Sequence, residues 1–185
     1  MLLELPVRRC TAPTEVLADL AAVGVSLIDE VSGPPALIDL ARSIGSVVPH
    51  RDSDSDGVTV IQDRGVREAA MAGFTRAALP PHTDRSGVAN PPGLLLTACG
   101  RQPDIGGEAL IVDGRAVHDD LAQVAPDALA ALYAPRSVLF GGADGHLGSV
   151  FALASGTAVA LRLRLDTLVR FAPAVAPHIP ALLAA

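Results

Sequence analysis

The stretch that decides the expected fold is LPPHTDRSGVANPPGLLLTACGRQPDIGGEALIVDG, residues 79–114. It contains a His-Thr-Asp tripeptide, a Pro-Pro turn at Asn90–Gly93 and two apolar runs, Leu94–Cys99 and Glu108–Val112. Both runs have the length of a short strand and are bounded by Gly and Pro, so we predict a buried strand at the first and another strand at the second. Short strands between such turns favour a β-sandwich or barrel.

The remainder of residues 46–185 continues this pattern of short elements. Further strands are predicted at Val58–Gln62 and Arg136–Phe140, and a hairpin is predicted at Val150–Leu165 around the turn Ser155-Gly156-Thr157. Three helical segments complete the region: Ala116–Val124, Pro126–Tyr133 and an apolar helix start at Pro177–Ala185. We expect these residues to form the β core.

Residues 1–45 read as a helix and strand cover on that core. Thr14 is the predicted N-cap of a helix that Gly24 ends, with Val16, Leu20 and Val23 on one face. A strand is predicted at Gly24–Val31, and a second helix at Ala36–Ser43, started by Pro34-Pro35 and closed by Gly45. The expected fold is therefore mainly β with flanking helices (α+β), in a single domain over residues 1–185.

Composition excludes several classes of protein. Half of the 185 residues are hydrophobic and 18% are charged, which predicts a folded globule. The net charge of −6 offers no basic field for nucleic acid or anionic membranes, so neither is expected as a partner. Cys10 and Cys99 have the spacing of neither a disulfide framework nor a zinc finger. No signal peptide or membrane-spanning run is recognisable, and a cytoplasmic location is expected by default.

The chemistry of the chain is expected at His82 and Asp84. On an extended segment, side chains at i and i+2 point to the same side, so an imidazole and a carboxylate would converge. With one further ligand they would make the facial 2-His-1-carboxylate arrangement, which leaves open positions on iron. By itself the tripeptide is common, and a surface His and Asp is the alternative interpretation.

The neighbourhood of the tripeptide is more specific. The order His82-Thr83-Asp84, then a Pro-Pro turn, an apolar strand and the Gly106-Gly107-Glu108 strand with a following helix resembles the taurine dioxygenase-like (TauD/TfdA) family of Fe(II)/2-oxoglutarate-dependent dioxygenases. The resemblance runs from Val47 to the end and is closest over Leu79–Asp120. Several elements in register make it far stronger evidence than the tripeptide alone.

The resemblance implies a fold, a cofactor and a reaction. The fold is a double-stranded β-helix, or jelly-roll, and the iron ligands that carry over are His82 and Asp84. The implied reaction oxidises, usually by hydroxylation, an unactivated C–H bond of a small metabolite. It consumes O2 and decarboxylates 2-oxoglutarate, the co-substrate, to succinate.

Two departures from the family pattern affect the expected site. Ala109 stands where the family has a threonine that helps to hold 2-oxoglutarate, and an alanine side chain cannot donate a hydrogen bond. The resemblance also implies a distal histidine ligand and a 2-oxoglutarate-binding arginine in the last strands, expected downstream of Ala185. We therefore expect an incomplete jelly-roll, completed by more chain or by a partner, which also makes self-association plausible.

Other candidate residues lie in the flanking loops. Thr83 is a candidate cofactor contact, and Gln62 and Arg64 are candidate substrate contacts. The aspartates of the loop Arg51–Gly57 resemble a calcium loop, but no glutamate stands at the twelfth position, which favours a solvated turn. Surface, loop or solvated positions are expected for the remaining histidines and two strand arginines: His50, His118, His146, His178, Arg162 and Arg164.

Three functions remain open at this point. The first is the dioxygenase. The second is a non-catalytic member that keeps the fold as a binding or assembly module, which Ala109 and the absent distal ligand favour. The third is another metal-dependent enzyme of the cupin type, which the Gly-Gly-Glu strand and the Pro-Pro turn disfavour.

Overall fold

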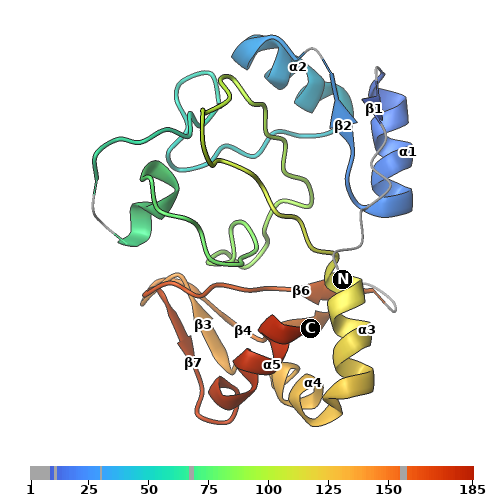
Figure 1. The fold of residues 1–185 in the computed structure, drawn as a ribbon, viewed down its shortest axis with the longest axis vertical. Helices are drawn as coiled ribbons and strands as arrows, with labels where there is room; N and C mark the ends of the chain where they lie inside the picture. Colours follow the sequence, from blue (N-terminus) through green and yellow to red (C-terminus); the bar gives the residue numbers. More distant parts are fainter. Residues whose placement is uncertain (1–8, 11, 30, 67–68, 155–157) are drawn as a thin grey trace. The chain divides into compact units, whose positions relative to one another are not determined.

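The structure is a computed structural model that describes residues 9–10, 12–29, 31–66, 69–154 and 158–185. Figure 1 shows the helices and strands of the described residues. By its internal contacts the chain divides into two compact units. Unit 1 comprises residues 1–60 and 94–110, and unit 2 comprises residues 61–93 and 111–185. The His-Thr-Asp tripeptide lies in unit 2.

Unit 1 is built on a small β-α-β element. Strand β1 (Arg9–Cys10) pairs in parallel with β2 (Leu27–Ile28), and helix α1 (Pro13–Val23) connects them. Gly24 ends α1 in the left-handed conformation at φ 77°, with its N–H bonded to Leu20 O at 3.0 Å. The predicted end of this helix is therefore confirmed, while the predicted strand shrinks to the two residues that have a parallel partner.

The start of α1 differs from the prediction. Its N-cap is Ala12 rather than Thr14, and Thr14 lies inside the first turn. The Ala12 N–H donates to the Glu15 carboxylate at 3.2 Å, and no side chain of Ala12 caps this helix. Pro13 at the first helical position fixes the backbone for this earlier start.

The second helix of unit 1, α2 (Gly33–Ile44), agrees with the prediction. The two prolines stand at its start, and the Gly45 N–H bonds to Ala41 O at 2.9 Å at its end. The loop Arg51–Gly57 turns as expected, with the Gly57 N–H donating to Asp54 O at 2.9 Å.

Three predicted strands are wrong. The segments Val58–Gln62, Leu94–Cys99 and Glu108–Val112 form no strand among the described residues. Leu95 is 67% exposed and Leu110 is 89% exposed, so neither side chain is buried. An apolar run becomes a buried strand only when a neighbouring strand takes up its N–H and C=O groups, and no ladder partner faces these runs in the described chain.

Unit 2 contains two antiparallel sheets. The first has the order β4-β3-β7, from strands His146–Gly148, Val138–Phe140 and Val169–Phe171. The second pairs β5 (Phe151–Leu153) with β6 (Val159–Leu161). Strand β3 confirms the strand predicted at Arg136–Phe140, and the β5–β6 pair confirms the hairpin predicted at Val150–Leu165. The predicted hairpin turn, residues 155–157, lies outside the described residues.

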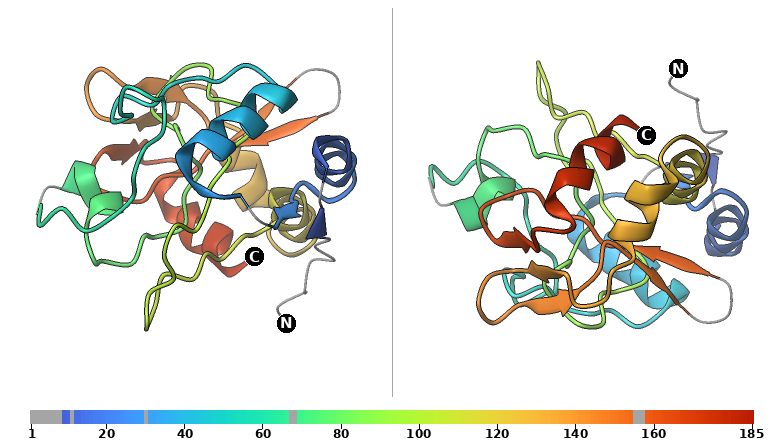
Figure 2. Two further views of the ribbon diagram at one scale, coloured as in Figure 1. Left: turned by 90° about the horizontal axis from the view of Figure 1, so that it is seen from above. Right: turned by 90° about the horizontal axis from the view of Figure 1, so that it is seen from below.

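Helices surround the sheets of unit 2. Helices α3 (Gly114–Val124) and α4 (Pro126–Leu132) confirm the prediction, including the break at Pro126. The 3-10 turns η1 (Ala69–Phe74) and η2 (Ala176–His178) and the short helix α5 (Ile179–Ala184) complete the unit. Within it α5 lies beside α3, and η2 lies beside α4 (Figure 2).

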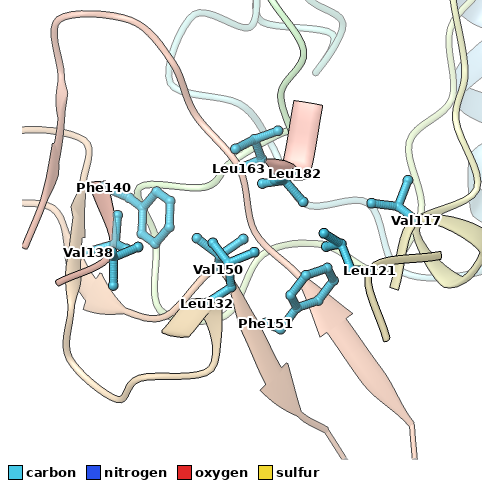
Figure 3. Packing of buried hydrophobic residues seen from close by; sticks show 10 residues of the cluster. Val117, Leu121, Leu132, Val138, Phe140, Val150, Phe151, Leu163 and Leu182 are labelled. Carbon is cyan, nitrogen blue, oxygen red and sulfur yellow. The ribbon is translucent and has the colours of Figure 1, made fainter. Parts of the chain in front are cut away.

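The core of unit 2 lies between these helices and the sheets (Figure 3). It is aliphatic apart from two phenylalanines, as the scarcity of aromatic residues requires. Its fully buried side chains are Leu121, Leu132, Val138, Phe140, Val150, Phe151 and Val175. In the described part of the chain, the strands of the three small sheets are two or three residues long, so the jelly-roll remains a prediction. The single domain, with residues 1–45 as a cover on a core of residues 46–185, also remains a prediction.

Candidate metal centre

His82 and Asp84 lie on one side of a turn-rich loop in unit 2. The His82 Nε2 atom is 3.8 Å from the Asp84 Oδ1 atom, and the two side chains are 39% and 53% exposed. The other ring nitrogen, Nδ1, lies 2.8 Å from the Pro80 carbonyl oxygen. A carbonyl oxygen can only accept, so Nδ1 donates in this contact, and Nε2 is the ring nitrogen that lies toward Asp84.

This arrangement has the character of a ligand pair. Metal-binding histidines usually donate one ring N–H to a carbonyl or carboxylate, which orients the other nitrogen toward the metal. Two ligand atoms about 2.1 Å from one metal ion and at a right angle are about 3 Å apart. A small rotation of these two exposed side chains would shorten the 3.8 Å separation to this distance, so the pair fits two coordination positions on one metal ion.

The third ligand is not found beside this pair. Among the described residues, no group of three His, Cys, Asp or Glu side chains could hold a metal ion. His146, His118 and His178 therefore do not complete the centre.

Thr83 attaches the loop to the segment that follows β6. Its N–H donates to Leu163 O at 2.9 Å, and the Leu163 N–H donates to the Thr83 hydroxyl oxygen at 3.1 Å. The structure directs the Thr83 hydroxyl to the Leu163 backbone, and the cofactor contact expected of Thr83 remains a prediction. The Thr83 backbone and hydroxyl are thus occupied by Leu163, while the side chains of His82 and Asp84 on either side of it stay exposed.

Arg162 holds the other end of the same loop. Its guanidinium donates to the carbonyl oxygens of Ser86 at 2.5 Å, Val88 at 2.5 Å and Ala89 at 3.1 Å. It also lies 5.7 Å from the centre of the Phe140 ring. The expectation of a solvated arginine is therefore wrong, and burial lowers the pKa of Arg162.

Arg164 and Asp166 form an ion pair close to His82. Arg164 donates from Nε at 2.6 Å and from a terminal nitrogen at 2.5 Å to the two Asp166 oxygens, and only about a quarter of each side chain is exposed. Burial raises the pKa of Asp166, but hydrogen bonds from Arg164 and the Leu168 N–H and the charges of Arg164 and His82 outweigh it. The pKa of Asp166 therefore lies below its usual value, and Arg164 is not on a solvated face.

The predicted substrate contacts lie in an adjoining loop of unit 2. Gln62 is exposed, and the Arg64 guanidinium lies 3.9 Å from the centre of the Phe74 ring. Ala109 is exposed in unit 1. Roles for Gln62, Arg64 and Ala109 in binding remain predictions.

Two histidines occupy other environments than predicted. His146 lies in strand β4 rather than in a loop, and burial together with the charge of Arg162 lowers its pKa. His118 is half-buried rather than solvated, because its Nε2 atom lies 3.0 Å from the Tyr133 hydroxyl and its ring packs edge-on against Phe151. Both side chains belong to the packing of unit 2.

His178 and His50 have surroundings of their own. His178 is partly exposed at the end of η2. The His50 Nδ1 atom, in unit 1, accepts the Asp52 N–H at 3.1 Å and so helps to shape the aspartate turn. The Asp56 carboxylate of the same turn accepts the Val58 N–H at 2.9 Å.

Comparison with known proteins gives one family. The family described as "Taurine catabolism dioxygenase TauD, TfdA family" matches residues 6–166. The chain belongs to this family. No curated protein and no solved structure matched the chain.

Membership of the TauD/TfdA family sets the general chemistry. The family has a double-stranded β-helix fold, and its members are typically Fe(II)/2-oxoglutarate dioxygenases with small-molecule substrates and O2. The matched segment contains His82 and Asp84 and extends to the Arg164–Asp166 pair. No helix in the described part of this TauD/TfdA chain is long and apolar enough to cross a membrane.

The sequence did not identify Arg162 as part of this centre. Its contacts join residues more than seventy positions apart, and no local pattern reports such a pairing. The one available signal was the arginine itself, which stands between Leu161 and Leu163 on a strand expected to be half-buried.

Proposed function

We propose that the chain is an Fe(II)/2-oxoglutarate-dependent dioxygenase that hydroxylates an unactivated C–H bond of a small metabolite. The observation that carries the proposal is the orientation of the His82 ring. Its Nδ1 atom is held 2.8 Å from Pro80 O, and its Nε2 atom lies 3.8 Å from the Asp84 carboxylate, an orientation that suits an Nε2 metal ligand beside a carboxylate ligand. Family membership then selects iron(II) and 2-oxoglutarate over other metals and co-substrates.

The chain's own residues orient and hold the two ligands. Pro80 O fixes the His82 ring, and Thr83 fixes the backbone between the two ligands through Leu163. The chemistry that a bound iron(II) ion supplies in such a centre is the reaction of O2 coupled to decarboxylation of 2-oxoglutarate to succinate. The third protein ligand in this proposal comes from outside the described residues.

Binding of the co-substrate is proposed to depend on groups other than Ala109. The alanine side chain has no donor, so a backbone N–H or another side chain must meet the 2-oxoglutarate carboxylate. Gln62 and Arg64 remain proposed contacts of the small-molecule substrate, and the proposed compartment is the cytoplasm.

A second candidate function is a non-catalytic TauD/TfdA module. Ala109 favours it, as does the absence of a three-ligand group from the described residues. The cupin-type alternative has no such support, because the matched family is TauD/TfdA.

Anaerobic titration with Fe(II) and 2-oxoglutarate separates the two functions. Joint chelation of iron by 2-oxoglutarate and the protein produces a visible charge-transfer band, which we expect for the parent protein and not for Asp84→Ala. The absence of a band in the parent protein would overturn the dioxygenase proposal and favour the non-catalytic module. Once the band is present, candidate metabolites that stimulate succinate formation identify the substrate.

A further inference from the structure

We infer that Arg162 is a positioning residue for the metal-ligand pair. It holds the loop after Asp84 so that the Asp84 carboxylate stays on the same side as His82 Nε2. The inference rests on the proposed function for its metal-binding consequence. Its structural half, the attachment of the loop, can be tested without metal.

The donors of Arg162 match the shape of the loop. The three carbonyl oxygens that Arg162 contacts belong to one short loop segment, and a guanidinium offers five N–H groups in one rigid plane. Arg162 uses two of its nitrogens to reach the carbonyls of Ser86, Val88 and Ala89. All three carbonyls lie within five residues of Asp84, so the guanidinium fixes the direction in which the chain leaves the ligand.

The charge of Arg162 points to the same role. In the described part of the chain, its hydrogen bonds go to carbonyl oxygens alone, and Arg162 is partly buried against the Phe140 ring. Partial burial of a cation whose hydrogen bonds go to carbonyl oxygens and not to a carboxylate has a desolvation cost, which the carbonyl dipoles offset in part. A surface ion pair would stabilise the unit at lower cost, so the position of this arginine is best explained by the loop that it holds.

The loop needs support from outside. Arg85, directly after Asp84, has φ 54°, a left-handed conformation that is unfavourable for a residue with a side chain. Its Nε atom is buried without a hydrogen-bond partner among the described residues. An isolated turn with these features would relax, and relaxation would rotate Asp84 away from His82.

Two adjacent residues, Arg162 and Leu163, therefore hold the loop by hydrogen bonds on the two sides of Asp84. Leu163 holds Thr83 on one side of it, and Arg162 holds residues 86–89 on the other. The backbones of Gly87 and Gly141 also meet closely, since a Cβ on Gly87 would lie 3.2 Å from the Gly141 Cα. Loss of the Arg162 hydrogen bonds alone should release residues 86–89 and leave Thr83 attached to Leu163.

The test compares Arg162→Ala with Arg170→Ala, which removes the same charge from an exposed arginine on β7. The first readout is binding of Co(II), followed by its visible absorption bands under anaerobic conditions. We expect Arg162→Ala to weaken Co(II) binding by about 10- to 100-fold, as loss of a residue that orients a ligand does, and to shift the bands. Arg170→Ala should bind as the parent protein does.

Rescue distinguishes positioning from general stability. Millimolar guanidinium, far below denaturing concentrations, should restore part of the Co(II) affinity of Arg162→Ala. Arg162→Lys keeps the charge but cannot reach three carbonyls, so its affinity should stay below that of the parent. Parent-like affinity in both Arg162 variants would overturn the inference.

Hydrogen exchange of the metal-free protein tests the loop itself. The Val88 N–H donates to Arg85 O at 3.1 Å in the part of the loop that Arg162 holds, and the Thr83 N–H donates to Leu163 O in the part that Leu163 holds. In Arg162→Ala or Arg162→Lys the Val88 amide should exchange at least about 10-fold faster while the Thr83 amide keeps its protection. Unchanged Val88 exchange overturns the inference even if the parent binds no Co(II), a result that by itself would contradict the proposed function.

Discussion

Two hydrogen bonds join Thr83 to the Leu163 backbone although 80 positions separate the two residues in the sequence. The Thr83 N–H reaches Leu163 O at 2.9 Å, and the Leu163 N–H reaches the Thr83 hydroxyl at 3.1 Å. The middle residue of the His-Thr-Asp tripeptide is therefore the point at which the ligand loop is attached to unit 2. The two flanking residues remain exposed for a ligand.

Replacement of Thr83 tests this attachment. Thr83→Val keeps the shape of the side chain but leaves the buried Leu163 N–H without its acceptor, which should cost about 1–3 kcal/mol of unfolding free energy. Thr83→Ser retains the hydroxyl and should stay within about 1 kcal/mol of the parent protein. Urea unfolding followed by far-UV circular dichroism measures both, and equal stability of the two variants would contradict the assigned role.

Gly145 limits the turn between β3 and β4. A Cβ at this position would lie 1.8 Å from the Phe140 carbonyl oxygen, a backbone atom at the end of a buried strand. Gly145→Ala should therefore lower the unfolding free energy by more than about 2 kcal/mol, because the strand end must shift. Gly93→Ala, whose Cβ would meet nothing within 4 Å, is the matched control and should be close to neutral.

Asp113 predicts a pH dependence of stability. A side-chain hydrogen bond from Arg115, with the Arg115 backbone N–H, holds the pKa of the Asp113 carboxyl below its usual value at the start of α3. A depressed pKa means that the carboxylate stabilises the fold above the unfolded pKa of about 3.9 and that this contribution is lost as pH falls through the lower folded value. The stability difference between the parent and Asp113→Asn should thus be full at pH 7 and shrink below about pH 4.

Unfolding curves between neutral and acidic pH measure this difference. A difference for Asp113→Asn that grows as the pH falls would have the wrong sign and would contradict the assignment.

Local signals predicted the helices well. Prolines at helix starts and glycines at helix ends fixed α2 and the end of α1, and Pro126 separated α3 from α4. The error at Thr14 arose because Pro13 at the first helical position and the contact of the Ala12 N–H with the Glu15 carboxylate place the helix start before Thr14. Helix signals succeed because most of a helix's hydrogen bonds lie within the segment itself.

Strand predictions depended on partners that the sequence does not reveal. The arm Val159–Leu161 is a strand because Phe151–Leu153 lies opposite, whereas the equally apolar Leu94–Cys99 run has no opposing strand in the described chain. The same limit applies to the site. The tripeptide itself identified His82 and Asp84 as a candidate pair, but Arg162 and Leu163 support it across more than seventy residues.

The most direct test of the central claim is the Fe(II) affinity of His82→Ala, measured anaerobically by titration calorimetry beside the parent protein and His178→Ala. If His82 Nε2 is a metal ligand, its loss should weaken Fe(II) binding by at least about 100-fold, more than the loss of a residue that only orients a ligand. His178→Ala, which removes a histidine from η2, should leave the affinity unchanged. Retained Fe(II) affinity in His82→Ala would contradict the assignment of the metal centre.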